Sequence, residues 1–108
     1  MRSSRFFVAA LACAASTLAG AQGAATPQQQ LQTRALAATC ANCHGTDGHG
    51  AAGSTVPALD GLPAAEIADK LRGFKSGALP ATVMHQLSKG YNDAQINQLA
   101  AYFAAQSR

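Results

Sequence analysis

Large aromatic side chains are scarce in this chain. It has 108 residues, no tryptophan, two tyrosines and four phenylalanines, and much of its hydrophobic fraction of 48% is alanine. A small domain built from such residues buries a thin core, and domains of this kind usually need a disulfide, a metal or a large cofactor for stability. We therefore expect a cross-link or a bound group.

The chain also lacks an apolar run long enough to cross a membrane. Residues 6–15 are apolar, but a serine and a threonine then end the run, short of the roughly 18 residues that a span needs. Two arginines precede the run and small residues follow it up to Ala21, which is the order of a secretory signal peptide. We expect residues 1–21 to be removed and residues 22–108 to form one domain. Cys13 leaves lipid attachment as an alternative, although the residue three places before it is alanine, where a large aliphatic residue would be expected.

No excess of one charge remains after such a cleavage. The whole chain has a formal net charge of +3, but loss of the two N-terminal arginines leaves six basic and five acidic residues. No run of lysine or arginine survives, and no basic stripe with interleaved aromatic residues. The mature chain therefore lacks the electrostatic footprint of a nucleic-acid-binding protein.

The alternation typical of β-strands is absent, and the apolar pattern is helical. Apolar residues recur at i, i+4 and i+7 after Pro27, in a stretch that would end at residues 40–44. A second helix would begin at Pro63 and end at Gly73 or Gly77. The predicted fold class is all-α, with about four short helices.

Two further helices are expected in the C-terminal third of the chain. Residues 81–89 predict a short helix stopped by Gly90, and Asn92 with Gln95 three residues later resembles a capping box for the last helix. Between the first two helices, residues 45–61 are rich in turn-forming residues and have no apolar periodicity. Loops of that length in a small domain usually have a function.

The segment CANCH at residues 40–44 carries the chemistry. In a CxxCH motif the thiols of Cys40 and Cys43 can add to the two vinyl groups of a haem, and the imidazole of His44 can bind the iron as the proximal ligand. A haem attached in this way would also supply the bulk that the core lacks.

Other sites built from two cysteines fit less well. A thioredoxin-type redox pair accompanies a βαβ pattern, which the sequence does not have. A zinc site needs a second pair of ligands, whereas the remaining histidines, His49 and His85, are single and far apart in sequence. A disulfide across two residues closes a very small loop and constrains little. One covalent haem is the favoured interpretation.

The second axial ligand decides what the haem can do. Once Met1 is lost with the signal peptide, Met84 is the only methionine, and the 40 residues that separate it from His44 allow the chain to reach the other haem face. We predict Met84 as the distal ligand, with His85 as the alternative that would give a lower reduction potential. His49 is expected to be a solvated loop residue. With both axial positions filled, the expected chemistry is outer-sphere transfer of single electrons, without a catalytic site in the chain.

At CANCHGTDGHG the chain resembles the class I cytochrome c family, and the resemblance covers nearly all of the mature chain. It implies a first helix ending in CxxCH, a long loop, middle helices, an axial methionine and a last helix that crosses the first. A proline of that family offers its carbonyl to the proximal histidine, and Pro57 matches its position. Such a bond would fix the tautomer of His44. Tyr102 and Phe103 would be ordinary core aromatics at the helix crossing.

Within the family, the run ATVMHQLSKGYNDAQINQLAAYF is similar to the cytochrome subunit of flavocytochrome c sulfide dehydrogenase, while FKSG and LAAYFAAQ are similar to cytochromes c4. The first resemblance implies a haem subunit that takes electrons from an FAD flavoprotein oxidising sulfide and passes them to a downstream cytochrome or oxidase. With one CxxCH motif, the chain would be a monohaem version without an internal relay between haems.

The alternative is a free periplasmic shuttle between a membrane dehydrogenase or cytochrome bc1 complex and a terminal oxidase. An apolar surface at the haem edge large enough for a permanent interface would favour the flavoprotein subunit. Two haem propionates would bring the net charge of the mature chain to about −1, which leaves little field to steer a partner. Charge alone does not decide between the two hypotheses.

Overall fold

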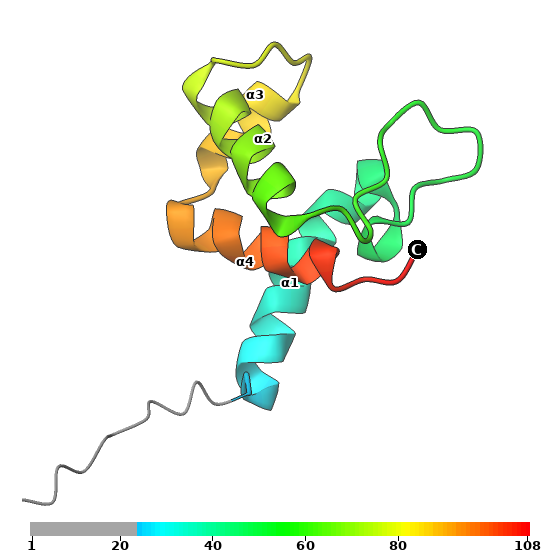
Figure 1. Ribbon diagram of the computed structural model, residues 1–108, viewed down its shortest axis with the longest axis vertical. Coiled ribbons are helices and arrows are strands. Elements are labelled where there is room, and N and C mark those ends of the chain that lie inside the picture. Colours follow the sequence, from blue (N-terminus) through cyan, green and yellow to red (C-terminus); the bar gives the residue numbers. More distant parts are fainter. Residues whose placement is uncertain (1–23) are drawn as a thin grey trace, which may run out of the picture.

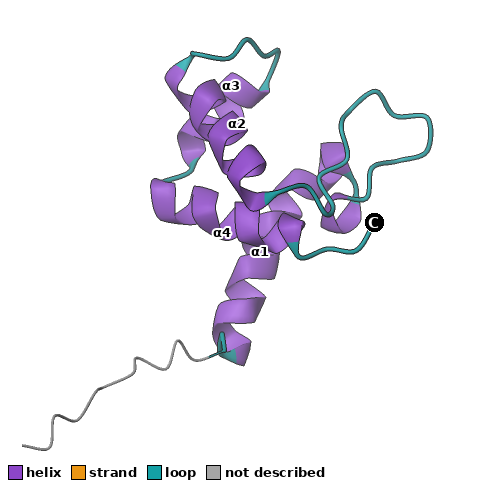
Figure 2. Ribbon diagram, viewed as in Figure 1, coloured by secondary structure: helices purple, strands orange, loops and turns teal. Residues whose placement is uncertain are grey.

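The computed structural model describes residues 24–108, so the expected signal peptide and Cys13 lie outside the described residues. Within residues 24–108 the chain is helical and has no strand, as Figure 1 and Figure 2 show, and the all-α prediction is confirmed. The α-helices are α1 (Pro27–His44), α2 (Ala64–Ser76), α3 (Met84–Leu87) and α4 (Asp93–Ala104), and the 3₁₀-helices are η1 (Thr46–Gly48) and η2 (Ser88–Gly90). In this part of the chain no helix is both long and apolar enough to cross a membrane.

Helix α1 has a well-defined start and end. The side chain of Thr26 accepts a hydrogen bond from the backbone of Gln29, whose side chain accepts one from the Thr26 N–H, and Pro27 occupies the first turn. At the other end Gly45 has a φ of 80°, which favours glycine, and a Cβ there would lie 2.7 Å from the Gly50 nitrogen. The helix therefore stops directly after His44.

The end of α2 and the start of α4 agree with the sequence-based predictions. Gly77 is the C-cap of α2 in the left-handed conformation, whereas Gly73 lies inside the helix beneath the side chain of Leu79. The capping box of Asn92 and Gln95 at the start of α4 is confirmed.

The expected helix over residues 81–89 is much shorter than predicted. Helix α3 begins only at Met84 and gives way after four residues to η2, which ends at Gly90. Two adjacent β-branched residues, Thr82 and Val83, precede it and fit poorly in a helix. Met84 is therefore the first residue of the helix and follows directly on an irregular segment.

The core lies where α1, α2 and α4 pack together (Figure 1). Half of its eight buried apolar residues come from α4. We call this set the apolar cluster: Ala37, Ile67, Ala68, Leu71, Ile96, Leu99, Ala100 and Phe103. Phe103 is a core aromatic, as expected. Tyr102 differs, because it is half-buried and its hydroxyl donates a hydrogen bond to Asp47 in η1. The loop after α1 is thereby tied to α4.

Candidate functional site

Three of the predicted site residues lie on the last turns of α1. The spacing of Cys40, Cys43 and His44, three and four residues apart, places them on one side of the helix. Cys40 is half-buried and packs against the apolar cluster, while Cys43 is exposed, and both thiols are free. Burial raises the pKa of the Cys40 thiol, and the neighbouring hydroxyl groups of Thr39 and Tyr91 act in the opposite direction. The free thiol of Cys40 is thus protonated at neutral pH.

The ring of His44 is held by the loop that follows α1. Its Nδ1 lies 2.7 Å from the carbonyl oxygen of Pro57. A carbonyl only accepts hydrogen bonds, so Nδ1 carries the hydrogen and, in the neutral ring, Nε2 keeps its lone pair. The resemblance to cytochromes c predicted this pair of residues. The contact leaves Nε2 available to a metal and fixes the direction of the ring.

Residues 45–61 fold back on themselves to bring Pro57 to His44. The N–H of Gly50 donates to the carbonyl of His44 at 2.7 Å, which closes the start of the loop. The Nδ1 of His49 lies 3.2 Å from a carboxylate oxygen of the buried Asp60. His49 is exposed, as expected of a solvated loop residue, and it also links the two ends of the loop through Asp60.

The predicted distal residues lie on α3. Met84 is half-buried and packs against the same apolar cluster as Cys40. Two buried polar atoms in this segment, Nδ1 of His85 and Oγ of Ser88, have no hydrogen-bond partner, and they are the only such side-chain atoms found in residues 24–108. Within residues 24–108, the buried side-chain atoms without a hydrogen-bond partner therefore all lie in the α3–η2 segment.

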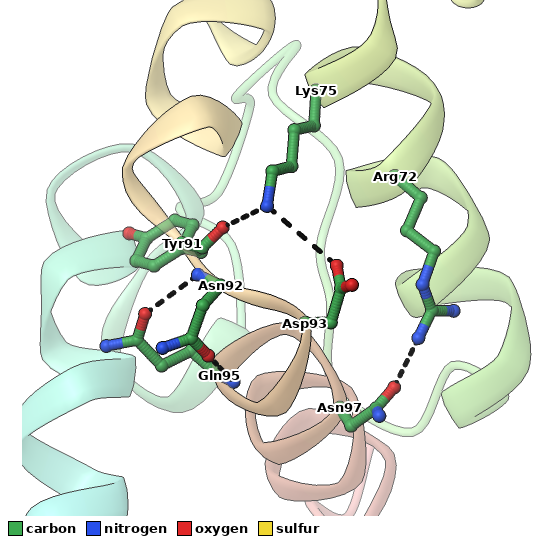
Figure 3. Close-up of polar contacts among 7 residues, drawn as sticks. All are labelled: Arg72, Lys75, Tyr91, Asn92, Asp93, Gln95 and Asn97. Atoms are coloured by element: carbon green, nitrogen blue, oxygen red, sulfur yellow. Dashed lines mark hydrogen bonds and ion pairs between the residues drawn. The ribbon is translucent and has the colours of Figure 1, made fainter.

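Sequence reasoning missed Tyr91 as a residue of this site. Its hydroxyl lies 2.8 Å from Oγ1 of Thr39 on α1. Its carbonyl accepts a hydrogen bond of 2.6 Å from Nζ of Lys75 on α2 (Figure 3). The same Lys75 lies 3.8 Å from Asp93 at the start of α4. Tyr91 lies between Gly90 and the cap of α4 and belongs to no periodic apolar pattern. The neighbouring sequence therefore gave no sign that it is part of the site.

A comparison with known proteins places the chain in a family. A family model described as cytochrome c oxidase, cbb3-type, subunit III, matches residues 23–103. The chain belongs to this family of c-type cytochromes. The cofactor of such a cytochrome is haem c, and its role is electron transfer.

Several named relatives are similar to this cytochrome. It is 35% identical over 94 residues to the cytochrome subunit of sulfide dehydrogenase from Chlorobaculum tepidum, and the match covers 87% of this chain and 84% of the relative. Over 99 residues it is 33% identical to cytochrome c-553 of Nitratidesulfovibrio vulgaris, covering 89% of this chain and 87% of the relative. It is 41% identical over 68 residues to the thiosulfate dehydrogenase electron acceptor of Thiomonas intermedia, but that match covers 63% of this chain and only 31% of the relative.

The side chains of the cytochrome fit haem c. Two free thiols and a histidine with an available Nε2 share one side of α1, and the thioether of Met84 is a soft ligand of the kind that iron accepts in this family. Two surface hollows, of about 410 and 560 Å³, lie elsewhere along α1 and α4, and neither is lined by His44 or Met84. The residues that would hold the haem therefore lie outside these two hollows.

Proposed function

We propose that the cytochrome holds one haem through thioether bonds to Cys40 and Cys43, with His44 as the proximal and Met84 as the distal ligand. The hydrogen bond from Nδ1 of His44 to Pro57 supports the proximal assignment, because it leaves Nε2 for the iron. The packing of Met84 against the same apolar cluster as Cys40 supports the distal assignment. His85 is the alternative distal ligand.

When bound, the haem supplies one-electron oxidation and reduction of its iron. The chain contributes attachment, orientation and surroundings. Pro57 orients the His44 ring, and the loop ties at Gly50 and His49 hold Pro57 in place. With His44 and Met84 both bound to the iron, the haem would have no open position for a substrate, which fits transfer of electrons between partners.

We further propose that the cytochrome is exported to the periplasm and serves as the haem subunit of a sulfide dehydrogenase. In this function it accepts electrons from an FAD flavoprotein that oxidises sulfide, and passes them to a downstream cytochrome or oxidase. The observation that carries this proposal is the similarity to the Chlorobaculum tepidum cytochrome subunit, which spans 87% of this chain and 84% of the relative.

A second candidate is a free electron shuttle of the periplasm. The similarity to a cytochrome c-553 over 89% of this chain and 87% of that relative supports it. The small net charge expected of the mature chain would give such a shuttle little long-range steering toward a partner. The two candidates differ in whether a flavoprotein stays bound during isolation.

The test is an absorption spectrum of the protein purified gently from its native periplasm, with and without added sulfide. Equal amounts of flavin and c-type haem, both reduced by sulfide, are expected for the sulfide dehydrogenase subunit. Haem without flavin, not reduced by sulfide, would reject that proposal in favour of the free shuttle. Mass spectrometry of the same sample checks for one haem and for cleavage after Ala21.

A further inference from the structure

Tyr91 joins the main helices of the fold. Its hydroxyl contacts Thr39 on α1, its carbonyl accepts a hydrogen bond from Lys75 on α2, and the next residue, Asn92, is the N-cap of α4. Its N–H donates to the carbonyl of Ser88 at 3.3 Å, which ties it to η2. Tyr91 thus fixes the C-terminal end of the short segment that begins at Met84.

The direction of the hydrogen bond between Tyr91 and Thr39 follows from the number of hydrogens. Oγ1 of Thr39 lies 2.7 Å from the carbonyl oxygen of Leu36, and a carbonyl can only accept. The single hydroxyl hydrogen of Thr39 is therefore used within α1. Tyr91 must be the donor in its 2.8 Å contact with Thr39.

The threonine that accepts the Tyr91 hydrogen lies beside a residue expected to carry the haem. Oγ1 of Thr39, which receives the Tyr91 hydrogen, is 3.9 Å from Sγ of Cys40. The sulfur of a thioether has no hydrogen of its own, so after attachment it can only accept. That sulfur lies beside Thr39, the acceptor of the Tyr91 hydrogen, so the positive end of the Tyr91 hydroxyl dipole is directed toward the part of α1 that carries the attachment point.

We infer that Tyr91 is a positioning residue of the redox centre, which raises the reduction potential through its hydroxyl dipole and restrains the segment carrying Met84. The inference rests on the proposed haem-binding roles of Cys40 and Met84. A positive dipole end near the attachment point disfavours the extra positive charge of the oxidised state. Tyr91 and Met84 both pack against the apolar cluster, so the anchored segment of residues 84–91 can move only if these contacts are lost.

The test uses the haem-loaded protein and the variant Tyr91→Phe, which removes one oxygen atom and keeps the ring. The ratio of oxidised to reduced protein at a fixed applied potential should rise about two- to tenfold, the range for loss of one hydrogen bond, and tenfold is about 59 mV for one electron. Imidazole should bind the oxidised variant more tightly than wild type, because the Met84 segment is less restrained.

Thr39→Val gives an independent check, because it removes the acceptor and keeps the tyrosine. It should shift the potential in the same direction, and the double variant should shift it little further, since both changes break the same interaction. Thr33→Val is the matched control on α1, where the threonine also donates to a backbone carbonyl and accepts from a side chain of α4, Gln98. Tyr102→Phe is the matched control for the loss of a tyrosine hydroxyl. Both controls should keep the wild-type potential.

Two outcomes overturn the inference while leaving the proposed function intact. One is a haem-loaded Tyr91→Phe protein with the potential and imidazole affinity of wild type. The other is an equal shift in Tyr91→Phe and Tyr102→Phe, which would mean that any lost tyrosine hydroxyl has this effect. A wild-type protein without covalent haem would instead reject the proposed attachment site, and the inference with it.

Discussion

Met84 is the side chain whose removal should change the redox properties most. In Met84→Ala, the haem should stay attached through Cys40 and Cys43, while the reduction potential falls and the iron gains an open position. Redox titration and the uptake of cyanide or imidazole by the oxidised protein measure both effects.

His85→Gln is the control for Met84→Ala, because it changes the neighbouring candidate ligand. This control should retain the wild-type potential and ligand uptake. If His85→Gln produced the loss of the ligand and Met84→Ala did not, the distal assignment would move to His85.

Tyr102 should titrate at unusually high pH. Its hydrogen bond to the Asp47 carboxylate raises the pKa of the phenol, and burial and the Asp47 charge add to this, against the opposite effect of Arg34. Because the pKa is raised on folding, the contribution to stability is complete below the unfolded value of about 10, and it is lost as pH rises through the higher folded value.

The variant Asp47→Asn tests this assignment by ultraviolet titration of tyrosinate. The pKa of Tyr102 should move down toward that of an ordinary tyrosine, and alkaline unfolding should begin at lower pH. Comparison with Tyr102→Phe separates its signal from that of the other tyrosine. An unchanged titration in Asp47→Asn would contradict the structure at this contact.

At the scale of elements, the loop after α1 depends on a glycine that packs against α4. Gly48 has a φ of 83°, and a Cβ there would lie 2.9 Å from a ring carbon of Phe103 and 3.0 Å from the Asp60 nitrogen. Gly53 has a similar φ of 76°, but a Cβ there would meet nothing within 4 Å. A side chain at either position would be strained by the positive φ. The two positions differ only in what that side chain would contact.

Gly48→Ala should therefore destabilise the protein more than Gly53→Ala. The backbone cost alone is about 1–2 kcal/mol for each variant, and the clash with Phe103 and the loop backbone adds to it only at position 48. Chemical denaturation of both haem-loaded variants measures the difference in the free energy of unfolding. Equal losses would mean that the loop moves away from α4 without cost.

Polar contacts also help to hold α2 against α4. Arg72 donates to the side chain of Asn97, and Lys75 links the end of α2 to the residues before α4 (Figure 3). These contacts lie on the side of the fold that supports Tyr91. They keep the start of α4, and with it the end of the Met84 segment, close to α2.

For the whole molecule, the apolar cluster of eight residues is small, and three of them are alanines. In a chain with so little buried apolar surface, an attached haem would add much of the stability by burying its own apolar surface against the folded chain. The variant Cys40→Ala/Cys43→Ala, which cannot attach haem covalently, should unfold at a much lower temperature than the haem-loaded protein. Circular dichroism on heating measures this, and equal midpoints would show that the protein core is sufficient.

The sequence by itself determined the features that depend on residues close together in the chain. The CxxCH motif at residues 40–44, the capping box of Asn92 and Gln95, and the stop of α1 before Gly45 each involve a few neighbouring residues. Such interactions form wherever the local order of residues permits them, so they could be predicted without knowledge of the rest of the fold.

Only the tertiary structure decided which distant residues meet around the site. Tyr91 and Thr39 are 52 residues apart, and Tyr102 and Asp47 are 55 apart. Neither pair has a periodic signal, because each contact exists only once α1 and α4 have packed together. The late start of α3 at Met84 was missed for a local reason, because an apolar pattern alone does not show that the β-branched residues Thr82 and Val83 fit poorly in a helix.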